Sequence, residues 1–389
     1  MAEGPARARS AAAPEQDEWG SVAPRAGAPA ADAFERDTAV RRLQRSDSAV
    51  ADGSRASYAA EVSSDWRAGR GPHGGYLAAM LLRALTETVA EPARSPRSLT
   101  IHYARAPRPG PVRIDTVIER GGRSLSTLSA RMEQDGKLMA LVLAAFSVPW
   151  TAPEIAELAM PEVEPPDAAR ETSGPLAEQV TSGRAPQFLR QLVVQPRMGG
   201  PPFSGSTAPM EVAAWLGLRD AARPVDALAL ALFSDSLFSP PFVRLTELAT
   251  SPTVELTIHF RTGHDGAGTE RHDPANLCFA RFRSALVHEG FFEEDGVIWS
   301  AGGTPLVQSR QLAILMPLRR KGPATGGPCG PRVSSRGCGR SSAAGGAGWA
   351  GSPLSDSLKP RMPLPSERPI SGRRFAPNTS STTTSRKAM

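Results

Sequence analysis

Cysteine is scarce in this sequence, with only three among 389 residues, and no pair of them has CxxC spacing. Cys278 lies in an apolar run, whereas Cys329 and Cys338 lie in a Gly- and Ser-rich segment. This pattern supports neither a disulfide framework nor a zinc site. It favours a reducing compartment, and we therefore expect a cytoplasmic protein.

Long apolar runs are also missing. None approaches the roughly 18–20 residues that a membrane-spanning helix needs, and the N-terminal residues lack the apolar core of a secretory signal. The sequence therefore gives no indication that the protein binds a membrane.

A net positive charge is absent from most of the chain, although the whole sequence has a net charge of +6 and a pI of about 9.7. The segment 317–389 has 13 Lys and Arg against 2 Asp and Glu, a balance of +11, so the rest of the chain has a balance of −5. A mildly acidic body does not predict a nucleic-acid-binding surface.

Several catalytic motifs are missing as well. The sequence has no GxSxG nucleophile elbow, no HExxH zinc motif, no GxxxxGK[ST] phosphate loop and no GxGxxG following a strand. These absences argue against a serine hydrolase of the α/β type, a zinc peptidase and a nucleotide-binding enzyme.

Composition divides the chain into five parts. The N-terminal 1–40 and the Gly/Ser/Pro-rich 317–389 have no hydrophobic period, and we predict that both are disordered. Two periodic regions, 41–150 and 205–316, are each long enough for a domain. A segment rich in Pro, Glu, Ala and Ser, 151–204, is predicted to link them.

The two periodic regions repeat each other. Leu-Thr-Ile-His occurs at Leu99–His102 and again 157 residues later at Leu256–His259, and both copies alternate as strands do. An Ala- and Leu-rich helical pattern precedes each copy, and further strand-like runs follow it. Each region is therefore predicted to contain one buried helix and an antiparallel sheet.

These patterns resemble the acyl-CoA thioesterase II family and its thioesterase-like relatives, over about 45–150 and 210–316. The resemblance rests on "PHGGYLAAMLLRA", "FSDSLFSPPF" and "LVQSRQLAIL" and on their order. It implies an α+β tandem (double) hotdog fold, with two long central helices each wrapped by a curved antiparallel sheet. It also implies hydrolysis of acyl-CoA to the free acid and coenzyme A, with no metal or redox cofactor. Related folds often pair further, so a homo-oligomer is compatible with it.

In that family an Asp, a Thr or Ser and a Gln hold the attacking water, and the matching residues here are Asp235, Thr253 and Gln311. The residues themselves support part of this, because Asp235 interrupts an apolar helical pattern and a buried carboxylate needs a donor. Aligning the two halves by their turns places Gln311 opposite Ala144, which suggests one working site per tandem pair. Gln308 is an alternative to Gln311; strand alternation puts the two on opposite faces.

The paired glycines Gly74 and Gly75 stand at the start of the first helical pattern, directly after His73. One interpretation is that their amides, with His73 beside them, bind the thioester oxygen at the positive end of the helix. The other is that the glycines only let the helix start pack against a neighbouring strand. The acidic pair Glu293-Glu294 is expected to be solvated.

Two alternative functions stay open at this point. A hydratase acting on acyl thioesters would need an Asp and a His facing each other across the hotdog pair, and no such pair is evident in the sequence. A non-catalytic acyl-CoA-binding module would keep the fold without turnover. The length of the acyl chain cannot be predicted, because it depends on packing.

Overall fold

The computed structural model describes residues 33–44, 54–69, 71–169, 171–220, 223–261 and 276–318. Most of the two predicted disordered tails, with Cys329 and Cys338, lies outside these residues. All of the described residues belong to one compact unit.

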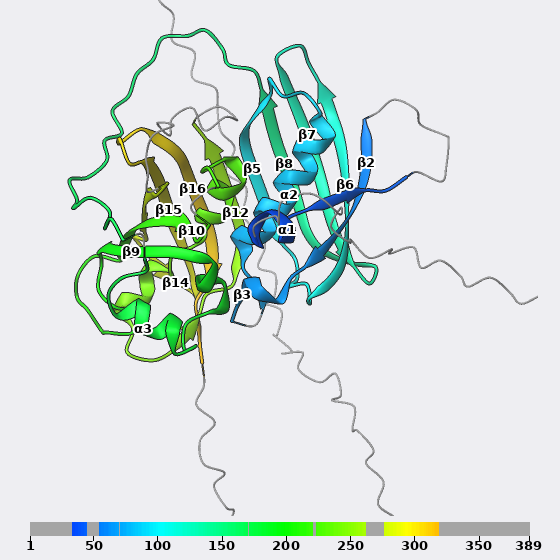
Figure 1. Ribbon diagram of the computed structural model, residues 1–389. Coiled ribbons are helices and arrows are strands. Elements are labelled where there is room, and N and C mark those ends of the chain that lie inside the picture. The colour runs from blue at the N-terminus through cyan, green and yellow to red at the C-terminus, as the bar shows by residue number, and fades with distance from the viewer. Residues whose placement is uncertain are drawn as a thin grey trace, which may run out of the picture. The chain divides into compact units, whose positions relative to one another are not determined.

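The main element is a single large antiparallel sheet (Figure 1). Its strands lie in the order β1-β2-β6-β7-β8-β5-β12-β16-β15-β13-β10-β9, and β14 pairs with β15 outside this path. The strands of the first half are β1 (Val40–Arg42), β2 (Arg55–Val62), β5 (Ser95–Tyr103), β6 (Gly110–Gly121), β7 (Leu125–Gln134) and β8 (Lys137–Ser147). The strands of the second half are β9 (Leu192–Met198), β10 (Glu211–Leu218), β12 (Thr253–Phe260), β13 (Cys278–Arg283), β14 (Val287–His288), β15 (Phe291–Ser300) and β16 (Pro305–Ile314). Two short pairs complete the set, β3 (Arg67–Ala68) with β4 (Gly71–Pro72), and β11 (Ala249–Thr250) with β17 (Met316–Pro317).

The two halves meet through the repeated tetrapeptide. Strands β5 and β12 pair antiparallel, and Thr100 lies opposite Thr257, with their hydroxyl oxygens 3.1 Å apart. Leu99 pairs with Ile258, so the repeat pairs with itself. On either side of this seam the strands follow the same order, β2-β6-β7-β8-β5 and β10-β13-β15-β16-β12. This confirms the predicted tandem arrangement.

The first half is built around one long helix, α2 (Gly74–Val89). Its Ala and Leu residues favour a helix, and eleven of its sixteen residues are buried, against the sheet and against the second-half helix. His73 caps its N-terminus by accepting a hydrogen bond from the amide of Tyr76 at 3.2 Å, and Ala90 ends it in the left-handed conformation.

The prediction of two long central helices is wrong for the second half. Helix α4 (Ala227–Phe233) has only seven residues, begins at the N-cap Asp226 and ends at Ser234. The Ala- and Leu-rich pattern continues beyond it, but Pro240 and Pro241 follow and begin the short 3-10 helix η3 (Pro240–Arg244). Proline cannot continue an α-helix, because it has no amide hydrogen. Asp235 therefore lies in a turn just beyond α4.

Two predicted boundaries also need correction. The sequence pattern predicts that residues 33–40 belong to the disordered tail, but they form α1 (Ala33–Asp37) and the start of β1, and Phe34 is buried in the core. The predicted linker 151–204 contains α3 (Pro175–Thr181), the 3-10 helix η2 (Gln187–Gln191) and β9, which is an edge strand of the main sheet.

The first part of that linker packs on the sheet. Trp215, Phe279 and Trp299 form an aromatic cluster, and Met160 and Val163 pack against it. The indole nitrogen of Trp215 donates to the carbonyl of residue 164 at 2.9 Å. The linker covers apolar side chains there, which explains why β10 is buried along nearly its whole length.

Candidate active site

Asp235 lies where the two halves meet, at the N-terminus of α2. The amide of Gly75 donates a hydrogen bond to Oδ2 of Asp235 at 3.0 Å. A helix N-terminus has unpaired amides and a partial positive charge, so it stabilises a carboxylate placed there. The side chain of Asp235 is 16% exposed, so it remains accessible from outside.

The paired glycines make this approach possible. A methyl group at position 74 would lie 2.7 Å from Oδ2 of Asp235, and one at position 75 would collide with the main-chain carbonyl oxygen of Leu232 in α4. Gly75 thus lets α2 start against the end of α4, and Gly74 leaves room for the carboxylate. The predicted close approach is real, but the groups that come close belong to the protein.

His73 supports Asp235 from the side. Its Nδ1 accepts the amide hydrogen of Tyr76, so Nε2 carries the proton and donates to the main-chain oxygen of Asp235 at 2.7 Å. The ring stacks on Phe188 of η2 at 4.1 Å and is almost completely buried. Burial lowers the pKa of His73, against the opposing charge of Asp235, so the imidazole is neutral at pH 7.

These contacts change the predicted roles of His73 and Gly75. Both ring nitrogens of His73 and the amide of Gly75 are engaged by protein groups. The expectation that they bind the thioester oxygen is therefore replaced by a supporting role around Asp235. Tyr103, which the sequence did not single out, joins them by donating from its hydroxyl to the carbonyl of Gly74 at 2.9 Å.

Burial raises the pKa of Asp235 above its ordinary value. The imidazole of His73, whose Nε2 lies 3.5 Å from Oδ2 of Asp235, and the amides of Gly75 and Gly74 lower this pKa in turn. A carboxylate whose pKa is raised by burial is a stronger base than an exposed aspartate, and this is the property that general-base catalysis requires. The same surroundings raise the pKa of Tyr103, through burial first and then the charge of Asp235.

Thr253 and Gln311 lie together on two neighbouring strands. The hydroxyl of Thr253, at the start of β12, donates to Oε1 of Gln311 in β16 at 2.8 Å. Gln311 is 4% exposed and faces inward, whereas Gln308 lies on the other face, next to exposed Arg310. This decides between the two glutamines. Leu256 pairs with Gln311 just as Leu99 pairs with Ala144, which confirms the alignment of the two halves.

Glu294 was missed by the sequence reasoning. It lies in β15 directly opposite Gln311, is only 3% exposed, and accepts a hydrogen bond from Nε2 of Gln311 at 2.7 Å. The expectation of a solvated acidic pair is wrong for this residue. A signal was present, because strand alternation places Glu294 on the same face as the apolar Phe292 and Ile298.

The site therefore consists of two clusters. One contains Asp235 with its supports, and the other contains Thr253, Gln311 and Glu294. No hydrogen bond among the described residues joins Asp235 to Thr253 or Gln311. The clusters are electrostatically linked, because burial first and then the charge of Asp235 raise the pKa of Glu294 to about 8.

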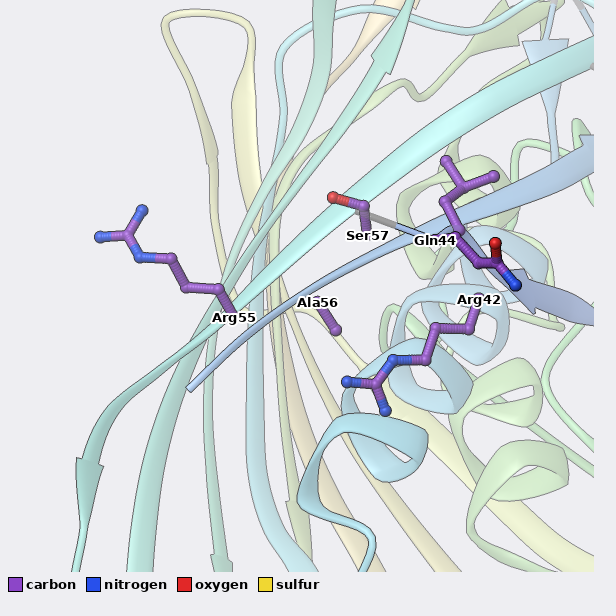
Figure 2. A pocket seen from close by; sticks show the side chains of 6 residues that line it. Arg42, Gln44, Arg55, Ala56 and Ser57 are labelled. Atoms are coloured by element: carbon purple, nitrogen blue, oxygen red, sulfur yellow. The ribbon is translucent and has the colours of Figure 1, made fainter. Parts of the chain in front are cut away.

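Other features add no chemistry to this site. In the described ranges no three His, Cys, Asp or Glu side chains gather closely enough to hold a metal ion. Nor does any helix there combine the length and apolar character that crossing a bilayer requires. A hollow of about 590 Å³ lies at the β1–β2 edge, and none of the predicted site residues lines it. Figure 2 shows the side chains that do line it. Its lining residues are Arg42, Leu43, Gln44, Arg55, Ala56 and Ser57.

Comparisons with known proteins agree with this division into halves. Residues 62–147 match the model of an acyl-CoA thioesterase N-terminal domain, and residues 162–315 match that of an acyl-CoA thioesterase C-terminal domain. Together they span more than half of the chain. The second match begins inside the predicted linker, in the stretch that packs on the aromatic cluster.

Individual relatives are more distant. An uncharacterised protein of Mycobacterium tuberculosis is 25% identical over 282 residues, which cover 66% of this chain and 89% of that protein. Among solved structures, a hot dog protein of unknown function from Alicyclobacillus acidocaldarius matches with a TM-score of 0.60 and 24% identity, covering 73% of this chain and 98% of that one. An acyl-CoA thioesterase II from Mycobacterium marinum matches with a TM-score of 0.54 and 19% identity, covering 74% and 99%. These structural likenesses show the hotdog fold.

Proposed function

The chain belongs to the acyl-CoA thioesterase family and is a thioester hydrolase, and from that premise we propose that it hydrolyses acyl-CoA with a water molecule held between Asp235 and the Thr253–Gln311 pair. The reaction forms a bond between the water oxygen and the acyl carbon and breaks the carbon–sulfur bond. The proton taken from the water passes to the departing sulfur, so the products are the free acid and coenzyme A in its thiol form.

Asp235 is the general base in this proposal. Its carboxylate is the most exposed acidic group of the two clusters and is held by the amide of Gly75. It takes a proton from the water as the water attacks, a step that typically contributes about 10²–10⁴-fold in rate. His73 and Tyr103 fix the turn and the helix start around it.

Thr253 and Gln311 position the same water. Because the Thr253 hydroxyl donates its hydrogen to Gln311, its oxygen lone pairs remain to accept a hydrogen from water. One hydrogen of the Gln311 amide is used by Glu294, and the second is available as a donor to the water oxygen. Both residues are neutral, so they leave the charge of Asp235 in place.

The structure brings an Asp and a His together across the two halves, which is the arrangement that a hydratase would need. Nε2 of His73 lies 3.5 Å from Oδ2 of Asp235. However, both ring nitrogens already bind main-chain groups, and the ring is buried under Phe188. His73 therefore has no nitrogen to offer a substrate, and this observation favours hydrolysis.

The observation that supports this proposal most strongly is the partly exposed Asp235 at the helix start, whose charge acts on Glu294, the hydrogen-bond partner of the inward-facing Gln311. The test is thiol release by the purified full-length protein with short, medium and long acyl-CoA, together with calorimetric binding of the same compounds. We expect release in at least one length class, and the profile will define the acyl chain. Tight binding without release in any class would instead support the non-catalytic binding module.

A further inference from the structure

Glu294 takes part in the proposed mechanism only through its hydrogen bond with Gln311. It lies on the inner face of β15, opposite Gln311 and almost completely buried. Its Oε1 accepts the Gln311 amide at 2.7 Å, while its buried Oε2 has no hydrogen-bond partner among the residues that the structure describes. A buried ionised carboxylate with an unpaired oxygen has an unfavourable free energy, and protonation of the carboxylate reduces this penalty.

The charges around Glu294 also favour its protonated form. The groups that raise its pKa by charge are both acidic, Asp235 beyond α4 and Asp295 on its own strand, and the only opposing group is the neutral amide of Gln311. From β16, Arg310 pairs with Asp295 at 2.6 Å on the outer face. In the neighbouring strand β13, Arg283 pairs with Asp295. The register therefore places the neutral Ser284, which follows Arg283, beside Glu294.

The ionisation of Asp235 and that of Glu294 oppose each other, and the groups around each carboxyl determine which of the two ionises more readily. Asp235 has the amides of α2 beside it, whereas Glu294 has a single side-chain amide. Two carboxylates in one site do not both ionise readily, so the less supported one keeps its proton. The amides therefore favour ionisation of Asp235, and the raised pKa of Glu294, about 8, favours its neutral form at pH 7.

We propose that Glu294 is a positioning residue of the hydrolytic site, where its neutral carboxylic acid form holds the amide of Gln311 without adding a second negative charge beside Asp235. This inference rests on the proposed thioesterase function. Holding one amide hydrogen on Glu294 and the amide oxygen on Thr253 fixes the direction in which the second hydrogen of Gln311 points. Ionisation of Glu294 would place a repelling charge near Asp235, so the site loses activity as pH rises above neutrality.

The test compares Glu294→Gln and Glu294→Ala with the wild type in thiol release from pH 5.5 to 9.5. Glutamine keeps an oxygen that accepts the Gln311 amide and cannot ionise. We expect it to retain kcat at pH 7 within about fivefold and to lose the alkaline decline. Alanine removes the acceptor, and we expect kcat to fall by about 10–100-fold with little change in KM, as for a lost buried hydrogen bond. Glu293→Gln is the matched control: Glu293 bonds the amide of Ala285 on the surface and should leave the profile unchanged.

An alkaline decline that persists in Glu294→Gln, or an alanine variant with wild-type kcat, would overturn the proposal. Infrared spectroscopy tests it without turnover, because a protonated carboxyl absorbs apart from a carboxylate. We expect a protonated-carboxyl band at pH 7 in the wild type that disappears in Glu294→Gln. If the band is present but no acyl-CoA is hydrolysed, the proposed function fails while the neutral acid stands; if the band is missing, the present inference fails.

Discussion

The two halves of the sheet have the same strand order but different residues at the positions of the candidate site. Gln311 and Glu294 face each other in the second half, and the register places Ala144 and Leu128 at the corresponding positions of the first. Thr253 stands three residues before Leu256, whereas Pro96 stands three before Leu99. The positions that carry polar side chains in the second half thus carry apolar side chains in the first half.

The helices differ in the same sense. Counting nine residues from each N-cap leads to Asp235 in the second half and to Leu82, inside α2, in the first. Shortening α4 frees Asp235 from the helix, while the long α2 supplies the amide that holds it. The repeat therefore brings together one composite site, in which the proposed base Asp235 comes from the second half and the amide that holds it comes from the first.

Gly75→Ala should disrupt the contact between the two halves most severely. A methyl group there meets the Leu232 carbonyl and the His73 ring, so α2 and α4 must separate and the hydrogen bond to Asp235 is lost. We expect kcat to fall at least about 100-fold and stability to fall by roughly 1–3 kcal/mol, measured by thiol release and urea unfolding. Gly121→Ala, where the nearest atom is 3.9 Å away, is the control. Wild-type activity in Gly75→Ala would show that the close approach is dispensable.

Gln311→Ala gives the second half the residue of the first. Removing the amide frees Thr253 and Glu294 from their partner, and we expect kcat to fall by about 10–100-fold, measured by thiol release. Gln308→Ala changes the same strand on its outer face and should retain wild-type kcat. Equal losses in both variants would mean that the inward position has no special role.

The acid side of the pH profile sharpens the assignment of the base. Asp235 must be ionised to accept a proton, and burial raises its pKa. We therefore expect kcat/KM to decline tenfold per pH unit below a midpoint higher than the ordinary aspartate value of 3.8, with melting curves at each pH to confirm that the protein stays folded. A midpoint at or below 3.8 would contradict the buried setting.

Glu294→Gln should have the smallest effect, on stability. The pKa of Glu294 is raised from 4.5 to about 8 on folding, so between these values the folded protein binds more protons than the unfolded chain. Stability from this group is fully present below pH 4.5 and is lost as pH rises through 8. Glutamine removes that loss, and its advantage in Tm over the wild type should grow from pH 5 to pH 8 by roughly 5 °C. A difference in Tm that does not change with pH would show that Glu294 is not the group that titrates.

Much of the fold could be predicted, because local patterns determined it. The repeated Leu-Thr-Ile-His predicted two equivalent strands, and the paired turns gave the alignment of Gln311 with Ala144. The length of α4 could not be predicted as easily, since its apolar period continues past Ser234 and only Pro240 and Pro241 interrupt it. The packed linker depended on contacts with Trp215 and Phe279, far away in sequence.

The site was predictable only in part. Asp235, Thr253 and Gln311 were reached through the resemblance, and the pairing of the last two appears in the structure. Glu294 was missed because two adjacent glutamates are usually solvated, and its burial follows from the neighbouring strands. The role of Gly75 was missed because the group that approaches its amide comes from Asp235, 160 residues away.

The central claim is that Asp235 is the base of a single composite site, and Asp235→Asn tests it most directly. Asparagine keeps the shape and still accepts the Gly75 amide through its oxygen, so acyl-CoA binding measured by calorimetry should change little. Thiol release under single-turnover conditions should fall at least about 10³-fold. Near-wild-type release by a variant that binds acyl-CoA normally would contradict the account.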